Sequence, residues 1–175
     1  MQLGVELEVL RNTEIDVENL HKKYLGIVLS PGPGEPKDAG QTLTILQKHS
    51  KSIPILGVCL GMQAIGIHFG AQLQKASYPM HGKVSEVSFN KEHPMFTKIK
   101  APFNVCRYHS LVLTNLEETN LQSLAETDEG EVMAIAHKKM PVWGVQFHPE
   151  AILTTQGMQL LENWVSSFNL RNNKR

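Results

Sequence analysis

Residues 53–61 read Ile53-Pro54-Ile55-Leu56-Gly57-Val58-Cys59-Leu60-Gly61, an apolar strand that runs into a Gly-x-Cys-x-Gly turn. With a helix after it, this is the pattern of a nucleophile elbow in which a cysteine replaces the usual serine. The elbow would place Cys59 at the N-terminus of the helix, where the helix dipole favours a thiolate. It would also turn the N–H of Leu60 toward an oxyanion formed on a substrate. On its own, the pattern fits a buried structural cysteine equally well.

A second apolar strand, at residues 142–147, ends in His148-Pro149-Glu150. Open α/β sheets place their sites just beyond the carboxyl ends of strands, which is where this histidine falls. Glu150 lies across a proline that fixes the local φ, and it is placed to accept the second N–H of the imidazole. Alone, His148 would be an ordinary loop histidine. With the elbow, it predicts a catalytic triad of Cys59 as nucleophile, His148 as base and Glu150 as orienting acid.

A third stretch also follows an apolar strand and reads Leu29-Ser30-Pro31-Gly32-Pro33-Gly34-Glu35-Pro36. Its three prolines and two glycines predict a rigid loop whose remaining N–H groups are free to face a ligand. The loop is not a phosphate-binding loop, because the Gly-Lys-Ser/Thr ending is absent. As an isolated signal it is more typical of a structural turn.

The alternation of short apolar runs with helical patterns predicts an α/β fold. Near-continuous apolar runs are typical of strands in a parallel sheet, and we expect them at residues 7–10, 25–29, 53–58 and 142–147. Helices are expected at residues 38–48, 59–69 and 157–168. Short alternating pieces between residues 84 and 136 predict an antiparallel excursion. We expect one domain over residues 1–169, followed by a polar tail at 170–175.

The composition is that of an ordinary globular protein. Lys plus Arg and Asp plus Glu number 17 each, so the chain has no excess of positive charge that would attract a nucleic acid or an anionic membrane. The two cysteines are too few for a disulfide framework and fit a reducing cytoplasm. No apolar run approaches the roughly 20 residues of a membrane span, and the first residues lack a signal-peptide pattern. We expect a cytoplasmic protein without a metal site, because the histidines lack metal-ligand spacing.

Taken together, three motifs closely resemble those of class I, or triad-type, glutamine amidotransferases. They are Ser30-Pro31-Gly32-Pro33-Gly34, Gly57-Val58-Cys59-Leu60-Gly61-Met62-Gln63 and Gly144-Val145-Gln146-Phe147-His148-Pro149-Glu150. Two further segments look like the glutaminase subunits that serve chorismate-using synthases: Met80-His81-Gly82-Lys83 and Arg107-Tyr108-His109-Ser110-Leu111. Those subunits are anthranilate synthase component II and the aminodeoxychorismate synthase glutaminase. The resemblance extends over residues 3–168.

The resemblance implies a flavodoxin-like, three-layer sandwich around a mostly parallel sheet. It also implies hydrolysis of L-glutamine to glutamate and ammonia without a cofactor. Cys59 would attack the side-chain amide, His148 would protonate the departing ammonia, and Glu150 would orient His148, before water hydrolyses the glutamyl thioester. The ammonia would pass through a channel to a chorismate-using synthase subunit, in a heterodimer or heterotetramer that makes anthranilate or 4-amino-4-deoxychorismate. The choice between the tryptophan and folate pathways stays open.

The resemblance also implies a set of substrate-binding residues. They are Gly32, Pro33, Gly34, Leu60, Gln63, Ser110 and Leu111. The backbone at Gly32 and Leu60 resembles the family's oxyanion hole. Gln63, Ser110 and Leu111 align with positions that hold the amino-acid end of glutamine. Discrimination of glutamine from glutamate needs polar groups of the protein that the wrong ligand would leave without hydrogen bonds. Without the resemblance, Gln63 reads as a helix-surface residue and Ser110 as a loop residue.

The sequence departs from the family near its start. Residues 3–9 align with the family's second strand, so we expect the family's first strand and helix to be missing. A missing interior strand would leave backbone groups unpaired and apolar surface open. A smaller departure is Ala151, where many relatives carry serine. Two alternatives stay open: a non-catalytic scaffold or regulatory subunit of such a synthase, and a cysteine hydrolase of another kind.

Overall fold

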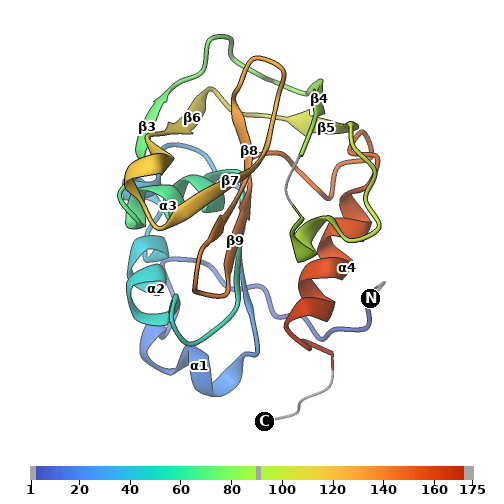
Figure 1. Ribbon diagram of the computed structural model, residues 1–175. Helices are drawn as coiled ribbons and strands as arrows, with labels where there is room; N and C mark the ends of the chain where they lie inside the picture. Colours follow the sequence, from blue (N-terminus) through green and yellow to red (C-terminus); the bar gives the residue numbers. More distant parts are fainter. Residues whose placement is uncertain (1–2, 90–91, 172–175) are drawn as a thin grey trace.

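A central five-stranded sheet carries both the elbow and the His-Pro-Glu segment in the computed structural model, which describes residues 3–89 and 92–171 (Figure 1). Its strand order is β1 (Ile27–Leu29), β2 (Ile55–Val58), β9 (Val142–Val145), β8 (Val132–His137) and β7 (Leu121–Glu126). Strands β1, β2 and β9 are parallel, whereas β8 and β7 run antiparallel to their neighbours. The parallel part of this mixed sheet therefore coincides with three of the four strands expected from apolar runs.

Helices cover both faces of the sheet and give the three layers expected from the sequence. On one face lie α1 (Leu20–Lys23), α2 (Thr42–His49) and α3 (Leu60–His68), and on the other lies α4 (Gly157–Ser167) (Figure 1). The predicted helices after the elbow and at the C-terminal end are thus confirmed, with bounds that differ by one or two residues.

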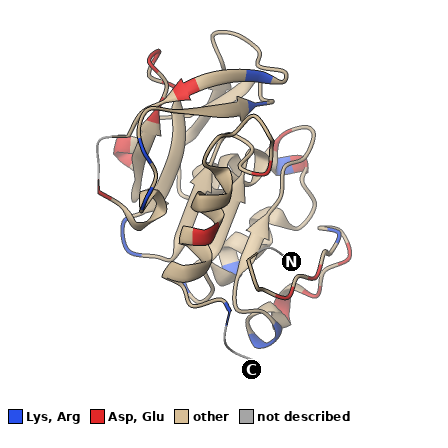
Figure 2. Ribbon diagram, turned by 90° about the vertical axis from the view of Figure 1, so that its right-hand side faces the viewer, with Lys and Arg blue, Asp and Glu red and all other residues tan. Residues whose placement is uncertain are grey.

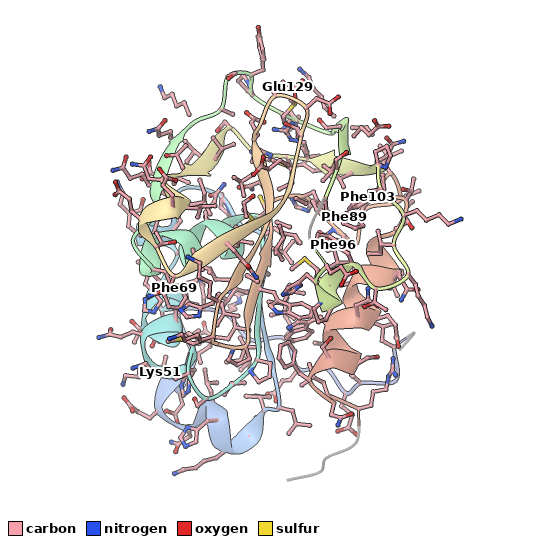
Figure 3. All side chains as sticks on the ribbon, in the orientation of Figure 1. Lys51, Phe69, Phe89, Phe96, Phe103 and Glu129 are labelled. Atoms are coloured by element: carbon pink, nitrogen blue, oxygen red, sulfur yellow. The ribbon has the colours of Figure 1, made fainter. Side chains whose placement is uncertain are left out.

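Alternation along β2 builds a separate core on each face of the sheet. Leu56 packs into the cluster that includes the apolar side of α4, whereas Ile55 packs into the cluster that includes α3. Three phenylalanines gather in the α4-side core (Figure 3). The ring of Phe89 stacks on Phe96 with centroids 4.1 Å apart, and it meets the ring of Phe103 edge to face with centroids 6.4 Å apart. Both faces of β2 are therefore fixed by packing before the chain reaches Cys59.

The expected antiparallel excursion is present, partly as β7 and β8 of the central sheet and partly as two strand pairs outside that sheet. Strand β3 (Gln72–Lys75) pairs with β6 (Leu111–Thr114), and β4 (Lys83–Val87) pairs with β5 (Phe103–Arg107). The short connection between β5 and β6 contains residues 108–110. This connection brings the segment that resembles the chorismate-linked glutaminases to the carboxyl end of the central strands.

The expected strand at residues 7–10 is wrong, because this segment has no regular structure. Leu7 and Val9 are 63% and 86% exposed. The segment is held by side chains instead: the Glu8 carboxylate pairs with Lys23 and accepts a hydrogen bond of 2.7 Å from the hydroxyl of Tyr24. An apolar run forms a strand only when another strand supplies hydrogen-bonding partners along it.

The helix expected from Asp38 begins later than predicted. Asp38 ends a 3₁₀ turn at Pro36–Asp38, and α2 begins at Thr42. Gly40 separates the two with a φ of +54°, a left-handed conformation that a continuous helix excludes. Leu46 is fully buried, as expected for the inward face of this helix.

The predicted polar tail begins with residues that contact the domain. Leu170 packs against the α4-side core. Arg171 pairs with Glu162 of α4, and its Nε donates a hydrogen bond of 3.0 Å to the carbonyl of Leu3. Residues 172–175 of the predicted tail lie outside the described residues. The first two residues of the predicted tail therefore pack on, or hydrogen-bond to, residues of the domain.

Replacing Leu56 with alanine should lower the free energy of unfolding by about 2–5 kcal/mol, because a fully buried leucine leaves a cavity between the sheet and α4. Denaturant unfolding followed by circular dichroism measures the change. The matched control is Val28→Ala on β1, whose side chain is 45% exposed and should cost less than about 1 kcal/mol. Equal losses at the two positions would contradict the assignment of this core.

Candidate functional site

Cys59 occupies a sharp turn between β2 and α3. Strand β2 ends at Val58, α3 begins at Leu60, and Cys59 alone makes the turn with φ 52° and ψ −104°. Its N–H donates a hydrogen bond of 2.8 Å to Val145 of β9, and its carbonyl accepts one of 3.1 Å from the N–H of Gln63. A positive φ is costly for a residue with a side chain, so the surrounding structure holds this conformation. The geometry is that of the predicted nucleophile elbow.

The two elbow glycines are required by close backbone approach. A Cβ atom on Gly61 would lie 2.2 Å from the carbonyl oxygen of Leu29 in β1. A Cβ atom on Gly57 would lie 2.5 Å from the backbone of Gly61. No side chain fits at either position without moving β1 or α3, so the Gly-x-Cys-x-Gly spacing follows from packing.

His148 lies in the loop after β9, and hydrogen bonds anchor that loop to β5. The N–H of His148 donates 3.0 Å to the carbonyl of Cys106. The hydroxyl of Thr154 donates 2.7 Å to the carbonyl of His148 and accepts 3.0 Å from the N–H of Cys106. The N–H and the carbonyl of His148 are therefore both tied to Cys106 of β5, the first directly and the second through the hydroxyl of Thr154.

The imidazole of His148 is oriented by Glu150. Its Nδ1 lies 2.7 Å from Oε1 of Glu150, so Nδ1–H donates to the carboxylate. The other ring nitrogen, Nε2, is buried and has no hydrogen-bond partner of good geometry among the described residues. This leaves Nε2 available to the Cys59 thiol and to a substrate.

Interactions among Cys59, His148 and Glu150 shift the pKa values of His148 and Glu150 toward their charged forms. Interaction with Cys59 and then with Glu150 raises the pKa of His148 to about 10, against the opposing effect of burial. Burial acts to raise the pKa of Glu150, but the hydrogen bond from His148 and a backbone hydrogen bond outweigh it, so that pKa lies below its usual value. At neutral pH the arrangement therefore favours an imidazolium between a carboxylate and the sulfur.

An open pocket of ≈ 430 Å³ lies over this group. It is lined by Pro31, Gly32, Cys59, Tyr108 and His148. The structure thus brings one residue of the predicted oxyanion hole, Gly32, next to the predicted nucleophile and base. A second hollow, of ≈ 480 Å³, is lined by Glu150 and the loop that follows but includes neither Cys59 nor His148.

The other predicted substrate-binding residues fall into two groups. Leu60 is buried, and its side chain would lie 2.9 Å from a Cβ on Gly32, so the two oxyanion-hole candidates adjoin. Gln63 and Leu111 are joined by a hydrogen bond of 3.1 Å from Nε2 to the carbonyl. Three predicted residues are exposed and do not line the pocket: Pro33, Gly34 and Ser110.

Comparison with known proteins identifies the fold and its family. The family model described as "Glutamine amidotransferase class-I" matches residues 1–168. The chain belongs to the class I glutamine amidotransferases. The structure of a GMP synthase component from Thermoplasma acidophilum, described as putative, matches with a TM-score of 0.85 and 29% identity, over 96% of this chain and 83% of that one. A glutamine amidotransferase of Thermotoga maritima shares the fold, with a TM-score of 0.64 and 19% identity over 93% and 66%.

Curated relatives narrow the comparison within the class I amidotransferases. "Anthranilate synthase component 2" of Azospirillum brasilense is 41% identical over 169 residues, which cover 95% of this chain and 86% of that protein. The "Bifunctional protein TrpGD" of Thermotoga maritima is 43% identical over 164 residues, or 92% of this chain. The chain spans only 28% of the length of that bifunctional relative. The resemblance drawn from the motifs is confirmed at the level of the family.

Two parts of this amidotransferase site were not anticipated from its sequence. Tyr108 lines the pocket, with its ring edge-on to His148 and to His81 at centroid distances of 5.1 and 5.9 Å. Gln146 is fully buried, and its Nε2 lies 3.6 Å from Sγ of Cys59. A signal for Gln146 was present, because it is the one polar side chain in the apolar run at residues 142–147.

The surface of this amidotransferase carries both signs of charge interspersed (Figure 2). Within residues 3–89 and 92–171, no cluster of three or more His, Cys, Asp or Glu side chains is arranged to hold a metal ion. In the same part of the chain, no helix has the length and apolar character needed to cross a bilayer.

Gly61→Ala should destroy the elbow, because the added Cβ would lie 2.2 Å from a backbone oxygen that cannot move without displacing β1. We expect loss of selective alkylation of Cys59 by iodoacetamide, measured by peptide mass spectrometry, and a lower melting temperature. The control is Gly130→Asn, at an open position whose φ of +80° asparagine tolerates. Wild-type alkylation in Gly61→Ala would show that the glycine is dispensable.

Raising the pH should remove the stabilisation that comes from the charged His148. Its folded pKa of about 10 lies above the ordinary value of 6.5, so this stabilisation is fully present below pH 6.5 and is lost as the pH rises through about 10. NMR titration of the ring gives the midpoint, which should fall in Glu150→Gln because the amide carries no charge. A wild-type midpoint near 6.5 would contradict the arrangement.

Proposed function

We propose that this chain hydrolyses L-glutamine to glutamate and ammonia, with Cys59, His148 and Glu150 as its catalytic triad. The observation that carries the proposal is the orientation of His148. Its Nδ1 donates to Glu150 at 2.7 Å, which leaves the buried Nε2 for the cysteine at the elbow. Membership of the class I amidotransferases supplies the reaction class, and the open pocket over the cysteine supplies space for a substrate.

The reaction begins with attack of the Cys59 sulfur on the side-chain amide carbon of glutamine. The oxyanion that forms is stabilised by backbone N–H groups of Leu60 and Gly32. Leu60 is the first residue of α3, where a helix N–H has no partner within its own helix. The C–N bond then breaks as the imidazolium of His148 gives its Nε2 proton to the leaving nitrogen. Ammonia departs and a glutamyl thioester remains.

Water completes the reaction. The imidazole of His148, now neutral, accepts a proton from a water molecule that attacks the thioester carbon. The C–S bond breaks, glutamate leaves and the imidazolium beside the sulfur is restored. The raised pKa of His148, about 10, suits it to hold that proton between turnovers. Glu150 retains its negative charge throughout and holds the required tautomer.

The amino-acid end of glutamine binds, in this proposal, at two segments near the pocket, of which only Gly32 lines it in this structure. The Pro-Gly loop contributes Gly32, Pro33 and Gly34. The second segment contributes Gln63, Ser110 and Leu111. The hydrogen bond between Gln63 and the Leu111 carbonyl supports the second group, because it ties α3 to the strand that follows Ser110.

We further propose that the ammonia passes to a chorismate-using synthase subunit in a heterodimer or heterotetramer. The names of the relatives in Azospirillum brasilense and Lactococcus lactis, "Anthranilate synthase component 2", support such a partner. They favour anthranilate over 4-amino-4-deoxychorismate as the product, and with it a role in tryptophan synthesis. The amidotransferase domain itself comprises residues 1–169 in this proposal.

Glutamine hydrolysis in the presence of the synthase subunit tests the proposal. The chain is co-purified with an anthranilate synthase component I, and glutamate and anthranilate are measured together. Cys59→Ser should abolish glutamate release. Glu150→Gln should lower kcat by about 10²–10⁴, because an amide holds the wrong tautomer of the imidazole.

The matched control is Glu162→Gln in α4, a carboxylate that pairs with Arg171. It should leave kcat unchanged. A complex that binds but releases no glutamate would favour the scaffold alternative. Release of glutamate with no anthranilate, but with 4-amino-4-deoxychorismate in a parallel complex, would keep the glutaminase and change the pathway.

A further inference from the structure

A buried amide lies directly against the proposed nucleophile. Gln146 follows β9 and is fully buried, and its Nε2 lies 3.6 Å from Sγ of Cys59. That distance is within hydrogen-bonding range for sulfur, which is a weak acceptor as a thiol and a stronger one as a thiolate. Cys59 lines the pocket and Gln146 does not, so the amide reaches the sulfur from the interior of the protein.

The orientation of this amide is set by a second one. Nε2 of Gln63 donates 3.2 Å to Oε1 of Gln146 and 3.1 Å to the carbonyl of Leu111. A backbone carbonyl only accepts, so the NH₂ group of Gln63 must face it, and the same NH₂ group then faces Gln146. Oε1 of Gln146 is occupied by this bond. Its NH₂ group is consequently the end that points at the sulfur.

The Leu111 carbonyl is itself held from the other side. Nε of Arg107, which always carries its proton, donates 3.0 Å to Nε2 of His109. His109 must therefore carry its proton on Nδ1, and it donates 2.9 Å to the carbonyl of Leu111. Burial and then the charge of Arg107 lower the pKa of His109 to about 4, so the ring stays neutral.

The far end of this chain of hydrogen bonds is a buried ion pair. Arg107 is completely buried, pairs with Glu131 and donates 3.0 Å to the hydroxyl of Ser85. A buried guanidinium is tolerated only when its hydrogen bonds are made, so this group is rigidly held. Hydrogen bonds thus connect the buried ion pair to the sulfur of Cys59, by way of His109, the Leu111 carbonyl, which accepts from both sides of the series, Gln63 and Gln146.

We propose that Gln146 is a catalytic residue that donates a hydrogen bond to the Cys59 sulfur, and that Gln63 is a positioning residue that aims it. The inference rests on the proposed role of Cys59 as nucleophile. The bond stabilises the sulfur when it is negatively charged, which occurs before attack on glutamine and again when the thioester breaks. It also holds Sγ in place, so that the remaining lone pairs face the pocket.

Alkylation of Cys59 by iodoacetamide tests the inference without glutamine or a synthase partner. The sulfur forms a bond to carbon and iodide leaves, at a rate that follows the thiolate population. Gln146→Met keeps the volume and removes the donor. We expect its alkylation rate near neutral pH to fall by a factor of about 3–10, the weight of one hydrogen bond, and the midpoint of the pH–rate profile to rise.

The matched control is Asn163→Leu, which removes another buried amide. Asn163 is 6% exposed and donates to the carbonyls of Met95 and Thr97, at 2.8 and 2.7 Å. This variant should lose stability and alkylate Cys59 at the wild-type rate. Peptide mass spectrometry assigns the modified cysteine, and Cys59→Ser provides the blank.

A folded Gln146→Met variant with the wild-type rate and pH profile would overturn the inference and leave Gln146 a structural residue. If that variant does not fold, the unsubstituted protein decides through the side-chain amide protons of Gln146 in NMR spectra. These should shift when Cys59 is alkylated, whereas those of Asn163 should not, and an unchanged Gln146 signal would also overturn the inference. If Gln146→Met slows the alkylation of Cys59 as expected but the unsubstituted chain releases no glutamate from glutamine, the proposed function fails and the hydrogen bond to the sulfur stands.

Discussion

Contact between the backbones of α3 and β1 sets the geometry on which the site depends. A Cβ atom on Gly61 would lie 2.2 Å from the carbonyl oxygen of Leu29, closer than any side chain tolerates. Glycine at this position lets α3 begin at Leu60, immediately after the residue that leaves β2. Cys59 must then make the entire turn, which it does with a φ of 52°. The strained conformation of Cys59 is therefore a consequence of the packing around it.

The parallel register of β2 and β9 turns two distant stretches of sequence into one site. Gly57 pairs with Gly144 and Val58 with Val145, so both strands end at the same edge of the sheet. The cysteine and the histidine emerge there side by side, as ligand sites do in open α/β sheets. Main-chain hydrogen bonds to β9 and β5 then hold both residues. The alignment of Cys59 and His148 thus depends mainly on backbone structure, with side-chain contacts from Thr154 and Glu150 completing it at His148.

The local structure could be predicted from the sequence where a motif restricts its own backbone. The elbow contains glycines and the His-Pro-Glu segment contains a proline, and these residues limit the backbone conformations that each segment can adopt. The sequence pattern did not predict the structure where contacts with residues far away in the sequence determine it. Residues 7–10 have the apolar pattern of a strand but no strand alongside them. Gln63 reads as a surface residue, yet it is 4% exposed because the sheet and the loops pack around nearly the whole of α3.

Gln146 shows how a single polar residue in an apolar run acquires meaning from its surroundings. A buried amide destabilises the fold unless both of its ends find partners. One end is satisfied by Gln63, and the other meets only the sulfur of Cys59 among the contacts of its side chain that the described structure contains. A hydrogen bond to a neutral thiol offsets little of the free-energy cost of burying this N–H, whereas a hydrogen bond to a thiolate offsets more of it. The buried amide of Gln146 and the imidazole of His148, which lines the pocket, are therefore both placed to interact with the sulfur of Cys59.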